Sequence, residues 1–207
     1  MGRRKRKKMI LLKEFDARIL EVVLALISAL EFREPYTVGH SERVTMYGLK
    51  IAKEIGFSPD RLNTLRYAGL LHDIGKIGVN ENILNKPGKL TPEEFEEVKK
   101  HPIIAKSILN PIRGLKDVIP LIYHHHERWD GNGYPTGLKG KLIPIESRII
   151  SIADTFDALT SDRPYRKKLT KEKAIEILIT EKYKQFDGEL VECFINILRK
   201  KCLKYKY

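Results

Sequence analysis

The apolar residues of this chain repeat with a helical period along most of its length. In residues 14–32 they fall at the spacing of one buried helix face: Phe15, Ile19, Val22, Val23, Leu26, Ile27 and Leu30. No run shows the apolar–polar alternation of a half-buried strand. The sequence therefore predicts an all-α fold, a single compact helical bundle, because such helices bury their apolar stripes against one another.

Capping residues divide this pattern into separate helices. Ser58-Pro59 is expected to open a helix, and Thr91 with Glu94 has the pattern of a capping box. Thr37 is the expected N-cap of an earlier helix. The expected helices cover about 14–32, 38–56, 59–72, 92–101, 102–110, 114–127, 144–160, 170–181 and 187–201. Loops are expected after His72, where Gly75, Gly78, Pro87 and Gly88 occur, and at 130–137.

The net charge of +12 is concentrated at the two ends. Basic residues in 3–8 and 199–206 account for all but one of these charges, so the body is near neutral. Solvated ends are one interpretation, and attraction to anionic lipid or nucleic acid is the other. No aromatic residue interrupts the first basic run, so no specific nucleic-acid partner is expected.

Cysteine use and hydropathy predict a cytoplasmic location. Cys193 and Cys202 are the only cysteines, and they form no C-x-x-C pair. No uncharged stretch reaches the roughly 18 residues that span a bilayer. Acidic residues from Glu14 onward exclude the apolar region of a signal peptide.

Polar groups on the apolar side of several helices are the main functional feature. His40, His72 and His101 are spaced with apolar residues, Asp73 adjoins His72, and Asp154 lies in an otherwise apolar helix. Burying each group without a partner costs several kcal/mol for a charge. A shared metal cluster would account for all of these groups together.

Each of these groups also has a simpler explanation when it is taken alone. A single inward histidine can be satisfied in a core, Asp154 can serve as a cap or ion-pair partner, and His124, His125 and His126 can form a solvated patch. Taken jointly, imidazole and carboxylate without thiolate suit iron, manganese or zinc. Two such ions can hold both the attacking and the leaving oxygen of a phosphoryl displacement, with Asp73 or Asp154 as the bridging carboxylate.

Basic residues near this cluster suit a phosphate. Lys76 follows Asp73 by three residues, and Arg163 and Arg166 flank Pro164-Tyr165 beyond the Asp154 helix. Ordinary surface charge is the alternative for all three. Asp157 is expected either to orient a metal ligand or to pair with Lys76.

Three motifs together resemble one family. His72-Asp73 is the doublet of the HD superfamily of metal-dependent phosphohydrolases. The segments 125–135 and 152–166, with His125-His126-Glu127 and Gly133-Tyr134-Pro135, look like the HD-GYP subfamily, which hydrolyses the bacterial second messenger cyclic di-GMP. The resemblance covers about residues 15–200. It divides the chain into a basic stub (1–13), a catalytic domain (14–201) and a basic tail (202–207).

The resemblance implies a role for each matched residue. It makes the metal ligands His40, His72, Asp73, His101, His125, His126 and Asp154, and leaves His124 out. It makes Asp73 and Lys76 catalytic, and Lys76, Gly133, Tyr134, Arg163 and Arg166 substrate contacts, with Tyr134 placed to stack on guanine. Plain loop packing is the alternative for Tyr134. The implied cofactors are two divalent ions, iron or manganese.

One departure from the family pattern bears on the number of metals. Some members have a glutamate four residues before the first histidine, which supports a third ion, whereas Tyr36 stands there in this chain and Glu34 lies two residues earlier. Tyr36 therefore favours a binuclear centre. Family members usually carry a sensory or receiver domain ahead of the catalytic one. The sequence leaves open whether this chain is a stand-alone enzyme or a fragment of a sensor protein. It also leaves open a homodimer and signalling partners.

The sequence thus predicts a cyclic di-GMP phosphodiesterase that forms linear pGpG and, by a second cleavage, GMP. Two other functions stay open. The first is a regulatory module that binds metal and nucleotide without turnover. The second is an HD phosphohydrolase for another nucleotide.

Overall fold

The computed structural model describes residues 21–30, 38–162 and 167–203, with side chains to Arg199. Residues 21–30 are helical. The later elements are α2 (His40–Glu54), α3 (Pro59–Leu71), η2 (Ile74–Gly78), α4 (Glu81–Leu84), α5 (Pro92–Val98), α6 (His101–Leu109), η3 (Arg113–Leu115), α7 (Ile119–Tyr123), η4 (Gly140–Leu142), α8 (Ile145–Thr160), α9 (Lys171–Thr180) and α10 (Gly188–Leu203). The described residues contain no β-strand, which confirms the all-α prediction.

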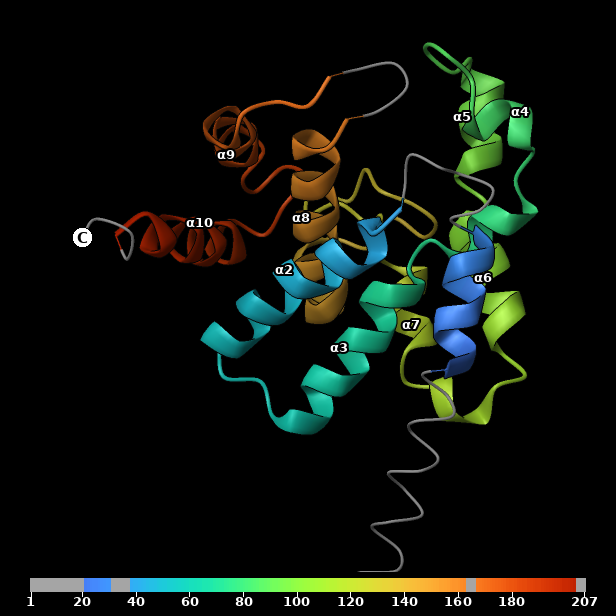
Figure 1. Ribbon diagram of the computed structural model, residues 1–207, viewed down its shortest axis with the longest axis horizontal. Helices are drawn as coiled ribbons and strands as arrows, with labels where there is room; N and C mark the ends of the chain where they lie inside the picture. Colours follow the sequence, from blue (N-terminus) through green and yellow to red (C-terminus); the bar gives the residue numbers. More distant parts are fainter. Residues whose placement is uncertain (1–20, 31–37, 163–166, 204–207) are drawn as a thin grey trace, which may run out of the picture.

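Helices α2, α3 and α8 pack against one another at the centre of the molecule (Figure 1). Their apolar faces bury Ile51, Leu65 and Ile149, each at most 1% exposed. Helix α10 adds Phe194, which meets Phe156 of α8 edge-on at 5.1 Å between ring centroids. Burial of this kind contributes roughly 1.5–3 kcal/mol for each large side chain, so the central helices give the site a rigid frame.

The capping prediction holds at two helix starts. Ser58 Oγ accepts a hydrogen bond from Arg61 N, and Thr91 and Glu94 make both bonds of a capping box. Helix α2, however, begins at His40, with Gly39 as its N-cap. Thr37, the expected cap, lies outside the described residues.

The helix expected over 114–127 is wrong in its extent. Residues 113–115 form the 3-10 turn η3, and α7 runs only from Ile119 to Tyr123. Pro120 occupies the first turn of α7, where its missing N–H costs nothing, so the helix starts late. The expected loop after His72 also contains two short helices, η2 and α4. As a result, His125 and His126 lie in a turn rather than within a helix.

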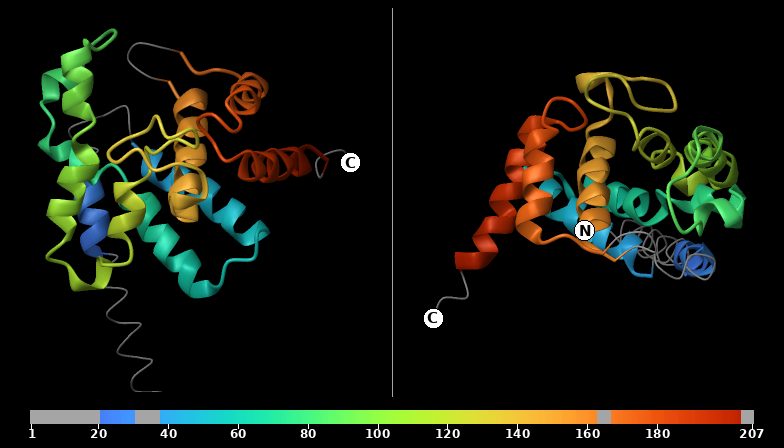
Figure 2. Two further views of the ribbon diagram at one scale, coloured as in Figure 1. Left: turned by 180° about the vertical axis from the view of Figure 1, so that it is seen from behind. Right: turned by 90° about the horizontal axis from the view of Figure 1, so that it is seen from above.

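Helices α4 and α5, together with the residues between them, form an arm at one end of the molecule (residues 81–98). Figure 2 shows this arm on the side opposite to α9 and α10. Neither helix has a buried residue, so the arm is not part of the core.

None of the helices in the described ranges combines the length and the apolar character that crossing a bilayer requires.

Close packing of η2 on α6 depends on Gly75. A Cβ at this position would lie 1.8 Å from His101 O and 2.7 Å from Ala105 N, both backbone atoms that cannot yield. Glycine therefore lets the segment after Asp73 approach the start of α6.

Gly75→Ala is expected to lower the free energy of unfolding by at least about 2 kcal/mol, the cost of overpacking a rigid contact. Chemical denaturation measures this loss. Gly48→Ala is the matched control, because its Cβ would stand at an ordinary 3.4 Å from an Ile149 methyl group. Equal stability of the two variants would contradict the prediction.

Candidate metal centre

Two groups of side chains that could each hold a metal ion share one residue, Asp73. The first group is His40, His72 and Asp73, and the second is Asp73, His101, His125 and His126. Within each group, one ligand atom per residue lies within 4.8 Å of all the others. A carboxylate has two oxygens, so Asp73 is placed to face two ions at once.

Four separate elements bring these side chains together. His40 begins α2, His72 and Asp73 directly follow α3, His101 begins α6, and the turn after α7 carries His125 and His126. All except His126 are at most 5% exposed.

Asp154 of α8 belongs to neither group but adjoins the first. Its Oδ1 lies 3.2 Å from His40 Nε2, and its side chain is 21% exposed. Of the seven expected ligands, six therefore fall in the two groups, and Asp154 stands beside His40.

The Nδ1 atoms of four histidines have fixed partners. Nδ1 of His72 bonds Gly69 O at 2.8 Å, His101 bonds Val98 O at 2.7 Å, and His125 bonds Ile122 O at 2.6 Å. In His40 the partner is Asp157 Oδ2 at 2.7 Å. Because a carbonyl only accepts, Nδ1 of the first three must carry the proton, which leaves Nε2 as a lone pair facing the centre.

The Nε2 atoms show that a metal fits this arrangement. His72 Nε2 is buried with no hydrogen-bond partner among the described residues. Nε2 of His101 and of His125 lie 3.4 Å apart. Two lone pairs at that distance repel each other unless a cation lies between them or beside them. Together with the ionised Asp73, they form a donor set that a divalent ion of the iron, manganese or zinc type satisfies.

The protonation states of most candidate ligands suit the binding of metal cations. Burial lowers the pKa of His101 to about 4 and of His126 to about 3, and it holds the pKa of His125 well below its usual value. These three are therefore neutral at pH 7. Burial opposes ionisation of Asp73 and Asp154, but Lys76 and the histidines near Asp73, and His40 beside Asp154, lower both pKa values.

His40 behaves differently. Burial disfavours its cation, but hydrogen bonds to Asp154 and Asp157 outweigh this and raise its pKa to about 9. Without metal, His40 is thus protonated at neutral pH, and coordination through Nε2 requires loss of that proton.

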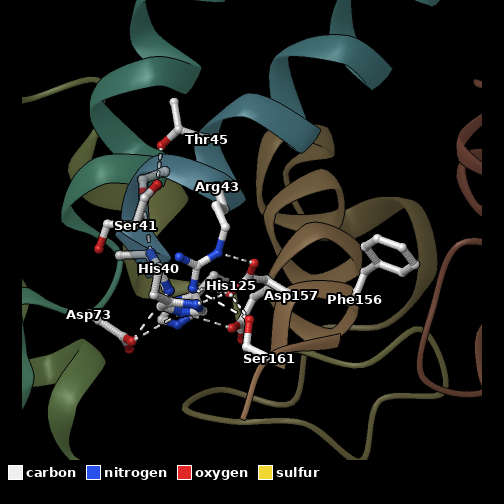
Figure 3. A network of polar contacts seen from close by, with 12 residues as sticks. His40, Ser41, Arg43, Thr45, Asp73, His125, Phe156, Asp157 and Ser161 are labelled. Carbon is white, nitrogen blue, oxygen red and sulfur yellow. Dashed lines mark hydrogen bonds and ion pairs between the residues drawn. The ribbon is translucent and has the colours of Figure 1, made fainter. Parts of the chain in front are cut away.

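Asp157 holds His40 in place, together with Arg43. Arg43 Nε donates to Asp157 Oδ1 at 2.6 Å, while the other carboxylate oxygen meets His40 (Figure 3). The contacts favour orientation of His40 over the expected alternative, a pair with Lys76, because Lys76 Nζ donates instead to Asp73 Oδ2 at 2.7 Å. Arg43 itself was not expected; its position one turn after His40 is the only sequence feature that could have indicated it.

The loop at 130–137 is attached to the His125–His126 turn. Tyr134 stacks on His126, with 4.8 Å between ring centroids and 27° between planes, and burial raises the pKa of its hydroxyl. Gly133 is required here, because a Cβ would lie 2.5 Å from Glu127 Cα. Of these two expected substrate contacts, Tyr134 therefore lies against a candidate metal ligand and Gly133 packs on the residue that follows it.

Glu127 and Thr136 fasten this loop, and neither was assigned a role from the sequence. Glu127 is 3% exposed, and its Oε1 accepts from Thr136 N at 2.8 Å and Thr136 Oγ1 at 2.6 Å. His124 lies beside this pair, 3.4 Å from Oε1, and not in either metal group. The position of Glu127 directly after two candidate ligands could have indicated a supporting role. Arg163, Arg166, Glu34 and Tyr36 lie outside the described residues.

Comparison with known proteins identifies the family. The chain matches the family described as "HD domain" over residues 24–190. It belongs to the HD-domain family. It is 43% identical over 188 residues to a cyclic di-GMP phosphodiesterase of Thermotoga maritima, covering 89% of this chain and 50% of that protein. It is 41% identical over 179 residues to the 3'3'-cGAMP-specific phosphodiesterase 3 of Vibrio cholerae, covering 86% and 38%.

These relatives confirm the HD-GYP resemblance seen in the sequence motifs. The chain spans about half the length, or less, of the curated relatives it matches. A solved structure of a cyclic GMP-AMP specific phosphodiesterase from V. cholerae has the same fold. It superposes with a TM-score of 0.69 at 21% identity and covers 86% of this chain and 48% of that one.

Metal binding by this HD domain is expected to release a proton from His40. At pH 7.5 the wild type should release about one more proton than His40→Ala, because burial keeps His101, His125 and His126 neutral before the metal binds. Calorimetric titration with Mn²⁺ in buffers of different ionisation enthalpy counts these protons. The metal affinity of the wild type should rise from pH 7 to pH 9 and then level off, since His40 loses its proton on its own above about 9. Equal proton release by the two proteins would refute this account.

The bond between Thr136 and Glu127 is expected to stabilise the HD domain measurably. Thr136→Val removes the hydroxyl donor to a buried carboxyl group and should cost about 1–3 kcal/mol of unfolding free energy. Thr136→Ser keeps the donor and should recover most of this loss. Urea denaturation of the three proteins tests the difference, and a serine variant no more stable than the valine variant would argue against it.

Proposed function

We propose that this HD domain is a metal-dependent phosphodiesterase that hydrolyses cyclic di-GMP to linear pGpG, and by a second cleavage to GMP. The observation that carries the proposal is the position of Asp73 in both ligand groups. One carboxylate shared by two groups is the arrangement expected of adjacent ions that act on a single phosphate. The names of the relatives supply the class of substrate.

Two divalent ions, iron or manganese, are the cofactors we propose. When bound, they would activate water and stabilise the charge of the phosphoryl group. His40, His72 and Asp154 would hold one ion, His101, His125 and His126 the other, and Asp73 both. Imidazole and carboxylate donors without thiolate support this choice of metals.

Lys76 is the proposed contact to the reacting phosphate. Its ammonium lies 2.7 Å from the shared carboxylate of Asp73, and its side chain is 17% exposed. It can therefore both lower the cost of burying Asp73 and donate to a phosphate oxygen at the mouth of the centre. Arg163 and Arg166 follow α8 closely in sequence, and we propose that they bind the outer phosphate oxygens.

The cyclic dinucleotide 3'3'-cGAMP is a second candidate substrate. A relative specific for it is nearly as similar to this chain as the cyclic di-GMP enzyme is. The two substrates share the ring of phosphates and sugars and differ in one base, so residues that contact the bases must decide between them.

Hydrolysis assays test both candidates. Protein purified anaerobically and loaded with Fe²⁺ or Mn²⁺ should convert cyclic di-GMP to pGpG faster than it opens 3'3'-cGAMP, as measured by chromatography. The reverse order would favour the second substrate. Tight binding of either without product would favour a regulatory module.

Asp73→Asn should abolish turnover and reduce bound metal from about two ions per chain to one or none, because a neutral amide is a poor bridge between cations. Elemental analysis and the hydrolysis assay measure the two effects. Asp117→Asn, on an exposed surface, is the control and should match the wild type in both. Full activity of Asp73→Asn would overturn the proposed mechanism.

Other expectations from the sequence stay predictions. They are the domain boundaries at 13/14 and 201/202, a homodimer or signalling partners, and the cytoplasmic location.

A further inference from the structure

The arm formed by α4 and α5 contributes no buried side chain to the hydrophobic core. Neither helix buries a residue, yet α5 carries Phe95, a large apolar side chain that is 45% exposed. Single exposed apolar residues are common on protein surfaces. Phe95 differs from these because of what surrounds its ring.

A row of rings connects Phe95 to the metal centre. Phe95 meets Tyr134 edge-on, with ring centroids 6.5 Å apart and planes at 84°. Tyr134 in turn stacks on His126, one of the candidate ligands. A single ring, that of Tyr134, therefore lies between the exposed Phe95 and the candidate ligand His126.

A cation lies beside the same two rings. Lys99 Nζ is 4.9 Å from the centroid of Phe95 and 5.8 Å from that of Tyr134. It also pairs with Glu96 Oε1 at 2.6 Å, which uses one of its three N–H donors. Aromatic faces next to a cation are the combination that binds nucleobases by stacking.

We propose that Phe95 of the arm and Lys99, the residue directly after α5, together with Tyr134, form a subsite for one purine base of the dinucleotide. The inference rests on the proposed function, since a phosphate at the metal centre would put its attached nucleosides near Tyr134 and Phe95. Phe95 supplies the stacking surface that a partly exposed ring offers. The arm would thus be a substrate-binding element.

Lys99 gives the subsite a preference for guanine. An ammonium group only donates hydrogen bonds, and guanine presents two neighbouring acceptors, O6 and N7. Adenine has a donor, its amino group, in place of O6. Lys99 is therefore a specificity-determining residue that favours cyclic di-GMP over adenine-containing dinucleotides at this position.

Binding measurements separate this inference from the proposed catalysis. The probes are phosphorothioate analogues of cyclic di-GMP and cyclic di-AMP, which resist hydrolysis, titrated calorimetrically into the metal-loaded full chain. Phe95→Ala should weaken both analogues about tenfold, the loss typical of a stacked base, and Phe95→Tyr should restore binding. Lys99→Gln should weaken the guanine analogue about fivefold and change the adenine analogue less than about twofold.

Lys100→Gln is the matched control, because Lys100 is the neighbouring lysine and pairs with Glu97. It should bind both analogues like the wild type. Thermal unfolding should be unchanged in all variants, since the arm buries no side chain.

Two results would overturn the subsite. One is binding by Phe95→Ala within twofold of the wild type. The other is an equal loss for both bases in Lys99→Gln, matched by Lys100→Gln, which would indicate general electrostatic attraction. If the binding pattern holds and cyclic di-GMP is not cleaved, the subsite stands and the proposed catalysis fails. If cleavage occurs and Phe95→Ala binds normally, only the subsite fails.

Discussion

The ionised carboxylate of Asp73, buried among imidazoles, is the group on which the rest of the site depends. Removing a carboxylate from water costs several kcal/mol unless charge and hydrogen bonds compensate. Here Lys76 supplies one charge at 2.7 Å, while Nε2 atoms of His40, His72 and His101 lie 3.4–3.8 Å away. Burial holds His101 neutral, so its Nε2 lone pair is available to a metal ion that Asp73 also faces.

Helix ends determine how those imidazoles are oriented. The carbonyls in the last turn of an α-helix have no partner within the helix. Gly69, Val98 and Ile122 lie in the last turns of α3, α5 and α7, and each accepts a hydrogen bond from the histidine three residues later. One local arrangement thus gives a carbonyl at a helix end a side-chain donor, fixes a tautomer and directs Nε2 into the centre. It is used by His72, His101 and His125, which explains why these three candidate ligands occur shortly after helix ends.

The sequence predicted the parts of this structure that depend on local pattern. Apolar periodicity and capping residues indicate the all-α class, the start of α3 at Ser58 and the capping box at Thr91. The inward spacing of His40, His72 and His101 predicts their burial. Contacts between distant segments could not be predicted in this way. Arg43 and Asp157 are 114 residues apart, and Thr136 reaches Glu127 only because the loop folds back, so no local spacing indicates either pair.

The early end of α7 illustrates why an error in helix length matters for function. In an α-helix, adjacent side chains point about 100° apart, so His125 and His126 could not both have faced one centre from a helix over 114–127. In the turn after Tyr123 their rings lie 3.9 Å apart at 42°, and both belong to the second ligand group. The turn also brings Glu127 under the following loop, where it bonds Thr136. Because the helix ends at Tyr123, His125 and His126 can both face the metal centre. The same turn places Glu127 where it attaches the loop that carries Tyr134.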